Sequence, residues 1–99
     1  MNYLNQKVIV RCNRAGVFFG VLKSYDAATR EAVITNCRQL WYWSGAASLM
    51  ELSQNGVKRP QQCKFTIVVP EVSVMEVIEV LPCSDKAVKS IEEVEEWKA

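Results

Sequence analysis

The chain has no histidine, no C-x-x-C pair and no glycine-rich phosphate loop, and these absences narrow the chemistry open to it. Without histidine, no side chain exchanges protons easily near neutral pH, and no Ser/His or Cys/His nucleophile can be assembled. The usual structural zinc patterns are excluded too. Neither G-x-x-x-x-G-K-[ST] nor G-x-G-x-x-G occurs. We therefore expect a protein that is not an enzyme and that uses no metal and no cofactor.

Long hydrophobic runs are also absent. No run approaches the roughly 20 apolar residues of a membrane span, and residues 1–7 lack the basic-then-apolar order of a secretion signal. The four cysteines, at positions 12, 37, 63 and 83, are widely spaced and are expected to be buried, reduced thiols; two disulfides in a secreted module are the alternative. We expect a cytoplasmic protein without membrane contact.

The length of 99 residues predicts one domain, residues 1–99, with a single modest core. Alternating patterns predict strands at residues 7–13, 16–25 and 31–36, with residues 40–43 either continuing the third strand or forming a fourth. Gly20, in the middle of the second segment, predicts a bulge or bend that curls the sheet. Adjacent Phe18 and Phe19 cannot both face inwards on a regular strand, so one of them is expected to be exposed.

The second half alternates between helices and strands. A helix is expected within residues 46–55, capped by Ser44 or by Ser48 with Glu51 in a capping box. Residues 64–69 predict a strand that Pro70 ends, and residues 72–81 predict another. A final helix over residues 85–93 begins at the cap Ser84. The organisation is then a β meander (1–43), an inserted helix (44–56), closing strands (63–82), a C-terminal helix (84–93) and an acidic tail (94–99).

The net charge of +1 conceals a polarity along the chain. Residues 1–64 hold nine basic and three acidic side chains, a net charge of +6, whereas residues 65–99 hold three basic and eight acidic ones, a net charge of −5. Either opposite charges solvate opposite faces, or the N-terminal part holds an anionic ligand. Trp97 is the one aromatic of the acidic tail and is expected to pack on its own domain or dock on a partner.

The segment W-Y-W-S-G-A-A-S, residues 41–48, is the strongest candidate for a ligand site. Two indoles spaced by two residues point to one face of a strand. Small residues follow at a helix start, where free N–H groups attract phosphate. Arginines at turns or strand ends can pair with phosphate. The candidate ligand-binding residues are Arg11, Arg14, Phe18, Arg38, Trp41, Tyr42, Trp43, Ser44, Gly45, Ala46 and Ala47. The alternative is that the tryptophans belong to the core and that residues 44–48 form only a capped turn.

Two resemblances accompany these patterns. V-x-V-R, then G-V-L-K-S-Y-D carrying Gly20, Leu22 and Asp26, then E-A-V-I-T-N, resembles the first motif of Sm-like and SH3-like small barrels, and residues 74–82 resemble their closing strands. A long insertion before those strands departs from the Sm pattern. Together with the two helices that the residue patterns predict, this resemblance implies a mainly β, β-rich α+β fold: a small curled antiparallel sheet or barrel with one inserted and one C-terminal helix.

The second resemblance covers nearly the whole chain. A-G-V-F-F-G-x-L, T-N-x-R-x-x-W-Y-W-S-G-A-A-S-L and I-E-V-L-P-C-S-x-K-A-x-K-S-I are similar to a family of small, uncharacterised phage-encoded domains. It implies a compact phage protein of the host bacterial cytoplasm, of the kind that counters bacterial defence.

Three functions are consistent with these observations. The first is a non-catalytic sponge that sequesters nucleotide second messengers, cyclic oligonucleotides or cyclic ADP-ribose species, and so inhibits antiviral signalling. The second is an Sm-like oligomer that binds RNA. The third is an interaction module that blocks a host protein. A short barrel exposes strand edges, so a homo-oligomer is expected.

Overall fold

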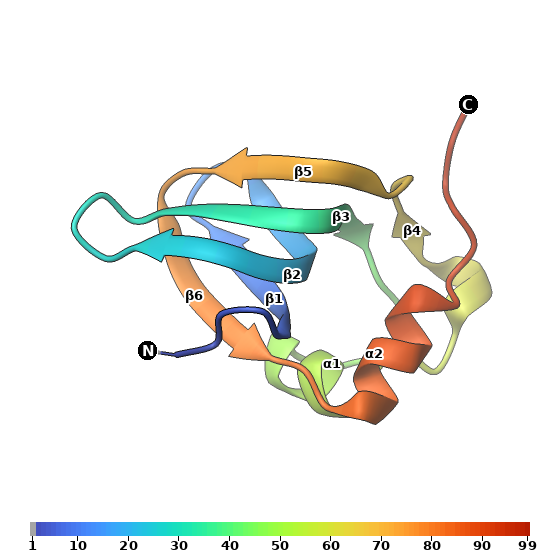
Figure 1. The fold of residues 1–99 in the computed structure, drawn as a ribbon. Helices are drawn as coiled ribbons and strands as arrows, with labels where there is room; N and C mark the ends of the chain where they lie inside the picture. Colours follow the sequence, from blue (N-terminus) through green and yellow to red (C-terminus); the bar gives the residue numbers. More distant parts are fainter. Residues whose placement is uncertain (1) are drawn as a thin grey trace.

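Three strands from the first half of the chain form the centre of the sheet in the computed structural model, which describes residues 2–99 (Figure 1). They are β1 (Lys7–Cys12), β2 (Gly16–Asp26) and β3 (Glu31–Tyr42), joined by tight antiparallel turns. Of the two alternatives for residues 40–43, the continuation of the third strand is confirmed as far as Tyr42, where β3 ends.

Three further strands, from the second half, complete one six-stranded antiparallel sheet. β4 (Lys64–Phe65) and β5 (Val69–Val74) both pair with the outer edge of β3, and β6 (Val77–Pro82) pairs with β1. The strand order is β4-β3-β2-β1-β6, with β5 beside β3. β5 leads straight into β6, but no ladder joins these two among the described residues. The expected mainly β fold with two helices is confirmed, and its curled sheet is not closed into a barrel.

The strand prediction around Pro70 was wrong. Residues 64–69 do not form one strand that Pro70 ends; β4 stops at Phe65, and Pro70 lies inside β5. Proline has no N–H to donate, so it is tolerated in a strand that has a neighbour on one side only. Within residues 2–99 β5 pairs with β3 alone, which makes Pro70 compatible with the sheet. The predicted strand over residues 72–81 is divided too, because Glu76 between β5 and β6 adopts a left-handed conformation with φ of 57°.

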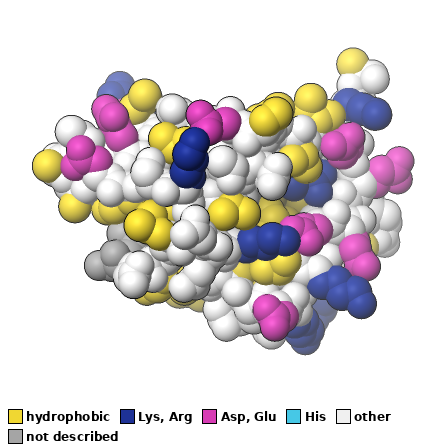
Figure 2. Space-filling model, in the orientation of Figure 1, with side chains coloured by type: hydrophobic (Ala, Val, Ile, Leu, Met, Phe, Trp, Pro, Cys, Tyr) yellow, Lys and Arg dark blue, Asp and Glu magenta, His cyan; other side chains and the backbone are white. Residues whose placement is uncertain are grey.

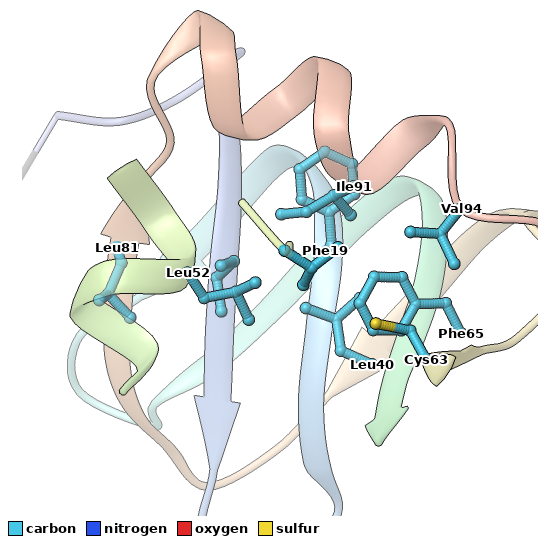
Figure 3. Close-up of a cluster of buried hydrophobic side chains, with 10 residues drawn as sticks. Phe19, Leu40, Leu52, Cys63, Phe65, Leu81, Ile91 and Val94 are labelled. Atoms are coloured by element: carbon cyan, nitrogen blue, oxygen red, sulfur yellow. The ribbon is translucent and has the colours of Figure 1, made fainter. Parts of the chain in front are cut away.

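One cluster of buried side chains fills the space between the sheet and the helices (Figure 3). α1 (Leu49–Asn55) and α2 (Asp85–Glu92) lie at the lower right of Figure 1, and Figure 3 shows their side chains facing those of the strands. The fully or nearly fully buried members are Ile9, Phe19, Leu40, Leu52, Val57, Cys63, Phe65, Leu81, Ile91 and Val94. At about 1.5–3 kcal/mol for each large side chain, this burial is the main reason that the helices stay on the sheet.

A second buried cluster lies on the other face of the same strands, inside the curl of the sheet. Its members are Val8, Val10, Cys12, Leu22, Ala32, Ile34, Cys37, Val74 and Val77. The prediction of one core was therefore wrong, because curling lets the sheet cover its own inner face. The same fact corrects the expectation for the phenylalanine pair: Phe19 is buried in the first cluster, and Phe18 is half-buried against the second rather than exposed.

The predicted bulge at Gly20 is confirmed, since the pairing of β2 with β3 shifts register between Phe19 and Val21. A Cβ atom on residue 20 would lie 2.5 Å from Cγ2 of Ile34 and 2.7 Å from the carbonyl oxygen of Thr35. We expect Gly20→Ala to lower the free energy of unfolding by about 1–3 kcal/mol through overpacking. Urea unfolding measures this, with exposed Ser24→Ala on the same strand as the control; equal stability of the two variants would contradict the close approach.

Both helices begin at serine caps. In α1 the Ser48 hydroxyl accepts a hydrogen bond from the Glu51 N–H, so the helix starts at Leu49 and not within residues 44–47. In α2 the Ser84 hydroxyl accepts from the Ala87 N–H, as predicted. A single 3-10 turn, η1 (Pro60–Gln62), lies between α1 and β4. Across residues 2–99, neither helix has the length and apolar character needed to span a membrane.

Candidate functional site

Trp41 and Trp97 form an exposed aromatic pair where the C-terminal tail returns to the sheet. The pairing of β3 with β4 shifts register between Leu40 and Tyr42, which leaves Trp41 at a bulge. The tail then runs parallel to β4 for one bridge, and the Trp97 N–H donates to the carbonyl oxygen of Phe65 at 2.8 Å. The two indole centroids are 5.3 Å apart with 33° between the ring planes. Trp97 thus packs on its own domain, one of the two outcomes left open.

A lysine completes this site. The Lys64 Nζ lies 5.6 Å from the centroid of each indole, within the range of a cation–π interaction. Trp41 is 57% exposed and Trp97 44% exposed, and the neighbouring Tyr42 is 50% exposed. We call Trp41, Tyr42, Lys64 and Trp97 the aromatic patch. It offers flat π surfaces and one ammonium group to solvent, and both suit a planar, negatively charged ligand.

Trp43 has a different role from Trp41. It is partly buried and packs against the cluster between sheet and helices, together with Ala46 and Leu49. The prediction that both indoles serve one surface depended on regular alternation, and the bulge at Trp41 interrupts that alternation. The ring that Trp41 contacts is Trp97.

The small-residue segment after Trp43 makes its polar contacts within the chain. The Ser44 N–H points to the Cys63 sulfur at 3.4 Å, and the Ser44 hydroxyl accepts from Arg59 Nε at 2.8 Å. The Ala47 N–H donates to a carboxylate oxygen of Glu51 at 2.6 Å. A carboxylate at this position repels a second anion. Residues 44–47 therefore form a turn that docks on the segment before β4, which is the second of the two alternatives that the sequence left open.

Gly45 is required by this docking. Its φ is +93°, and a Cβ there would lie 2.5 Å from the backbone nitrogen of Lys58. We expect Gly45→Ala to cost about 2–3 kcal/mol of unfolding free energy, because backbone strain adds to the clash. The matched control is Gly16→Ala, where φ is also positive but the nearest atom is the flexible side-chain amide of Gln39 at 3.0 Å. Differential scanning calorimetry on both variants tests this, and an equal loss in the two would contradict a docking role for Gly45.

Arg38 lies inside the protein and not at the aromatic patch. Its side chain is nearly fully buried, and its guanidinium donates to four carbonyl oxygens, those of Thr66, Phe65, Ile91 and Val94, at 3.0–3.3 Å. Burial lowers the pKa of Arg38 from its usual value, and nearby Glu96 opposes that shift. A guanidinium stays protonated even so. Arg38 joins β3 to β4 and the residue after it, and to the C-terminal end of α2, so it positions the tail that carries Trp97.

The other two candidate arginines are paired with acidic residues of the second half. Arg14 forms a two-pronged contact with Glu76, at 3.0 and 3.1 Å, and Arg11 lies 3.6 Å from Glu79. The hydrogen bond from Arg14 holds the pKa of Glu76 below its usual range. Both arginines are exposed, Arg14 in the turn between β1 and β2 and Arg11 near the end of β1.

The same pairing explains the charge polarity of the sequence. All four ion pairs of the described residues join a basic side chain of the first half to an acidic one of the last third: Lys7–Glu92, Arg11–Glu79, Arg14–Glu76 and Lys23–Glu71. Figure 2 accordingly shows basic and acidic side chains next to each other on the face that it draws. Much of the polarity is thus neutralised by ion pairs between segments that are far apart in the sequence.

Sequence reasoning identified Trp41 and Tyr42 but missed Lys64 and Trp97 as members of one site. In the sequence, Lys64 contributed only to the net charge of residues 1–64, and Trp97 was expected only to pack on its own domain or dock on a partner. Their proximity comes from a tail-to-strand bridge between Phe65 and Glu96, far apart in the chain. Trp97 itself, an aromatic in an otherwise charged tail, was the one available signal.

Among the described residues, no group of three or more Cys, Asp or Glu side chains is arranged to hold a metal ion.

Comparison with known proteins places the chain in a family. None of the curated proteins matches the chain. Residues 5–91 match the family described as "Domain of unknown function (DUF6948)", a match that includes Trp41 and Lys64 and ends before Trp97. Because this match covers most of the chain, the chain belongs to the DUF6948 family.

Proposed function

We propose that this protein is a non-catalytic binding protein that captures a nucleotide on the aromatic patch. The single observation that carries the proposal is the exposed Trp41–Trp97 pair with the Lys64 ammonium 5.6 Å from both rings. A base that stacks on an exposed aromatic side chain gains about 1–3 kcal/mol. The ammonium beside the rings supplies the charge that a phosphate needs.

The state of the thiols supports binding without turnover. Burial raises the pKa of the Cys37 thiol to about 11 and that of the Cys83 thiol to about 12, and it raises the pKa of Cys12 as well. Nucleophilic cysteines need a lowered pKa, because the thiolate is the reactive form. These three side chains are therefore protonated at neutral pH and act as small apolar residues of the interior.

In its finer form, the proposal is a phage sponge that works in the bacterial cytoplasm and sequesters cyclic oligonucleotide or cyclic ADP-ribose messengers of antiviral signalling. Sequestration depends on slow release and needs no chemical step. The similarity to phage-encoded domains supplies this setting. The outer edges of β5 and β6, which have no strand partner among residues 2–99, are the surfaces through which copies would associate into a homo-oligomer.

A thermal-shift screen tests the proposal. Cyclic dinucleotides, cyclic ADP-ribose, oligo-U and oligo-A are added separately to the purified protein. A ligand at about 100 times its Kd stabilises the native state by ~2.7 kcal/mol, which corresponds to a rise in Tm of about 10 °C or more in a domain of this size. A rise with cyclic nucleotides supports the messenger form, and a rise with RNA alone replaces it with the Sm-like alternative. No rise with any nucleotide would overturn the proposal and leave the interaction module.

A further inference from the structure

Half of the basic side chains form no ion pair within residues 2–99 and lie neither in the core nor against the indoles. Four are in ion pairs, Arg38 binds carbonyl groups and Lys64 lies against the indoles. The six that form no ion pair within residues 2–99 are Arg30, Lys58, Arg59, Lys86, Lys89 and Lys98. Four of these, Lys58, Arg59, Lys86 and Lys89, belong to one loop and one helix that face each other.

A cleft of about 490 Å³ lies between that loop and α2, lined by Val57, Pro60, Lys86, Lys89, Ser90 and Glu93. Lys86 and Lys89 are three residues apart on α2 and therefore lie on the same side of the helix. Lys58 and Arg59 are exposed and lie between two lining residues in sequence. Figure 2 shows basic side chains over this end of the molecule, at its lower right. Two lysines and one carboxylate, that of Glu93, thus line the cleft, and its other wall is the loop that carries Lys58 and Arg59.

The walls of the cleft are held together. The Val57 N–H donates to the Ser90 hydroxyl at 3.0 Å, which fastens the loop to α2. Gly56 approaches the helix so closely that a Cβ on it would lie 2.3 Å from the Cβ of Ser90. The spacing of loop and helix is therefore set by the fold, so a ligand meets a preformed site.

A short piece of chain connects the cleft to the aromatic patch. Glu93 lines the cleft, and Trp97, four residues later, contacts Trp41. Four residues span at most about 14 Å even when fully extended. One ligand with two or more linked nucleotides can therefore reach both places.

We infer that this cleft binds a phosphate group of a ligand whose base stacks on Trp41 and Trp97, so that the ligand is an oligonucleotide, linear or cyclic. This inference rests on the proposed function and adds the class of ligand to it. The lysines at positions 86 and 89 neutralise the phosphodiester, and Val57 and Pro60 form an apolar floor. Each phosphate contact to a single strand adds about 0.7 to the slope of log K against log salt concentration.

The test is a fluorescence-anisotropy titration with a labelled oligonucleotide, a cyclic dinucleotide and AMP, each over a series of salt concentrations. The variant is Lys86→Gln/Lys89→Gln, and the control is Lys23→Gln/Arg30→Gln, which removes the same charge around the β2–β3 turn. We expect the α2 variant to bind the oligonucleotide or the cyclic dinucleotide at least tenfold more weakly, with a salt slope smaller by about 1.4 for two lost contacts. AMP binding should not change.

The outcomes separate this inference from the proposed function. A loss shared equally by the α2 variant and the control would mean general charge attraction and would overturn the inference. Equal affinity of AMP and the longer ligands for the native protein would overturn it as well, while leaving nucleotide capture by the aromatic patch in place. A loss with only the linear or only the cyclic ligand supports the inference and identifies the source of the phosphate.

Discussion

Replacing Arg38 by alanine should lower the free energy of unfolding by about 3–5 kcal/mol, because buried carbonyl groups of two segments lose their shared donor. These are the carbonyl groups of Phe65 in β4 and Thr66 directly after it, and of Ile91 in α2 and Val94 just beyond it. Domains of this size are stable by only about 5–15 kcal/mol, so the loss is a large share of the total. Urea unfolding followed by tryptophan fluorescence measures it.

Two further variants make the Arg38 prediction specific. Arg38→Lys keeps the charge but not the fork of donors, so it should recover only part of the stability. Arg14→Ala removes an arginine that is 80% exposed, and its unfolding midpoint should hardly move. If Arg38→Ala were as stable as Arg14→Ala, the buried guanidinium would not hold the tail. Should Arg38→Ala fail to fold, Arg38→Lys still permits the comparison.

Replacing Trp41 by alanine should weaken nucleotide binding by about 10- to 100-fold, since one stacking surface is worth ~1–3 kcal/mol per base. Trp41 is more than half exposed, so the protein should stay folded. Trp97→Ala should have a similar effect, because it removes the second ring. Isothermal titration calorimetry with the ligand selected in the thermal-shift screen measures both.

The control for these variants is Met50→Ala, a change at another large exposed side chain, on α1. Its affinity should equal that of the native protein. Circular dichroism of each variant separates loss of binding from loss of fold. Binding that survives in both tryptophan variants would contradict a ligand site at the aromatic patch.

Local signals predicted the parts of the fold that depend on neighbouring residues. The alternation of residues between the two faces of a strand predicted β1 and β2, Gly20 predicted the bulge, and Ser84 predicted the start of α2. Elements that depend on distant partners were not predictable in this way. Whether Pro70 ends a strand or joins one depends on whether an edge is free, and the second core depends on how far the sheet curls.

The candidate site shows the same division. The exposure of Trp41 and Tyr42 was among the alternatives given by the sequence, but Trp97 reaches Trp41 only because the tail pairs with β4. A guanidinium suits phosphate and carbonyl oxygens equally well, so the sequence could not assign Arg38 to the interior. The register of β1 with β6 brings Arg11 opposite Glu79, a pairing that no local pattern encodes.

The most direct test of nucleotide capture uses the three tryptophans as separate probes. Each indole N–H gives one signal in a ¹⁵N–¹H NMR spectrum, and the variants Trp41→Phe, Trp43→Phe and Trp97→Phe assign them. On titration with the nucleotide that raises Tm most, the Trp41 and Trp97 signals should shift together, while the half-buried Trp43 signal stays in place. Unchanged Trp41 and Trp97 signals at a saturating nucleotide concentration would contradict the account.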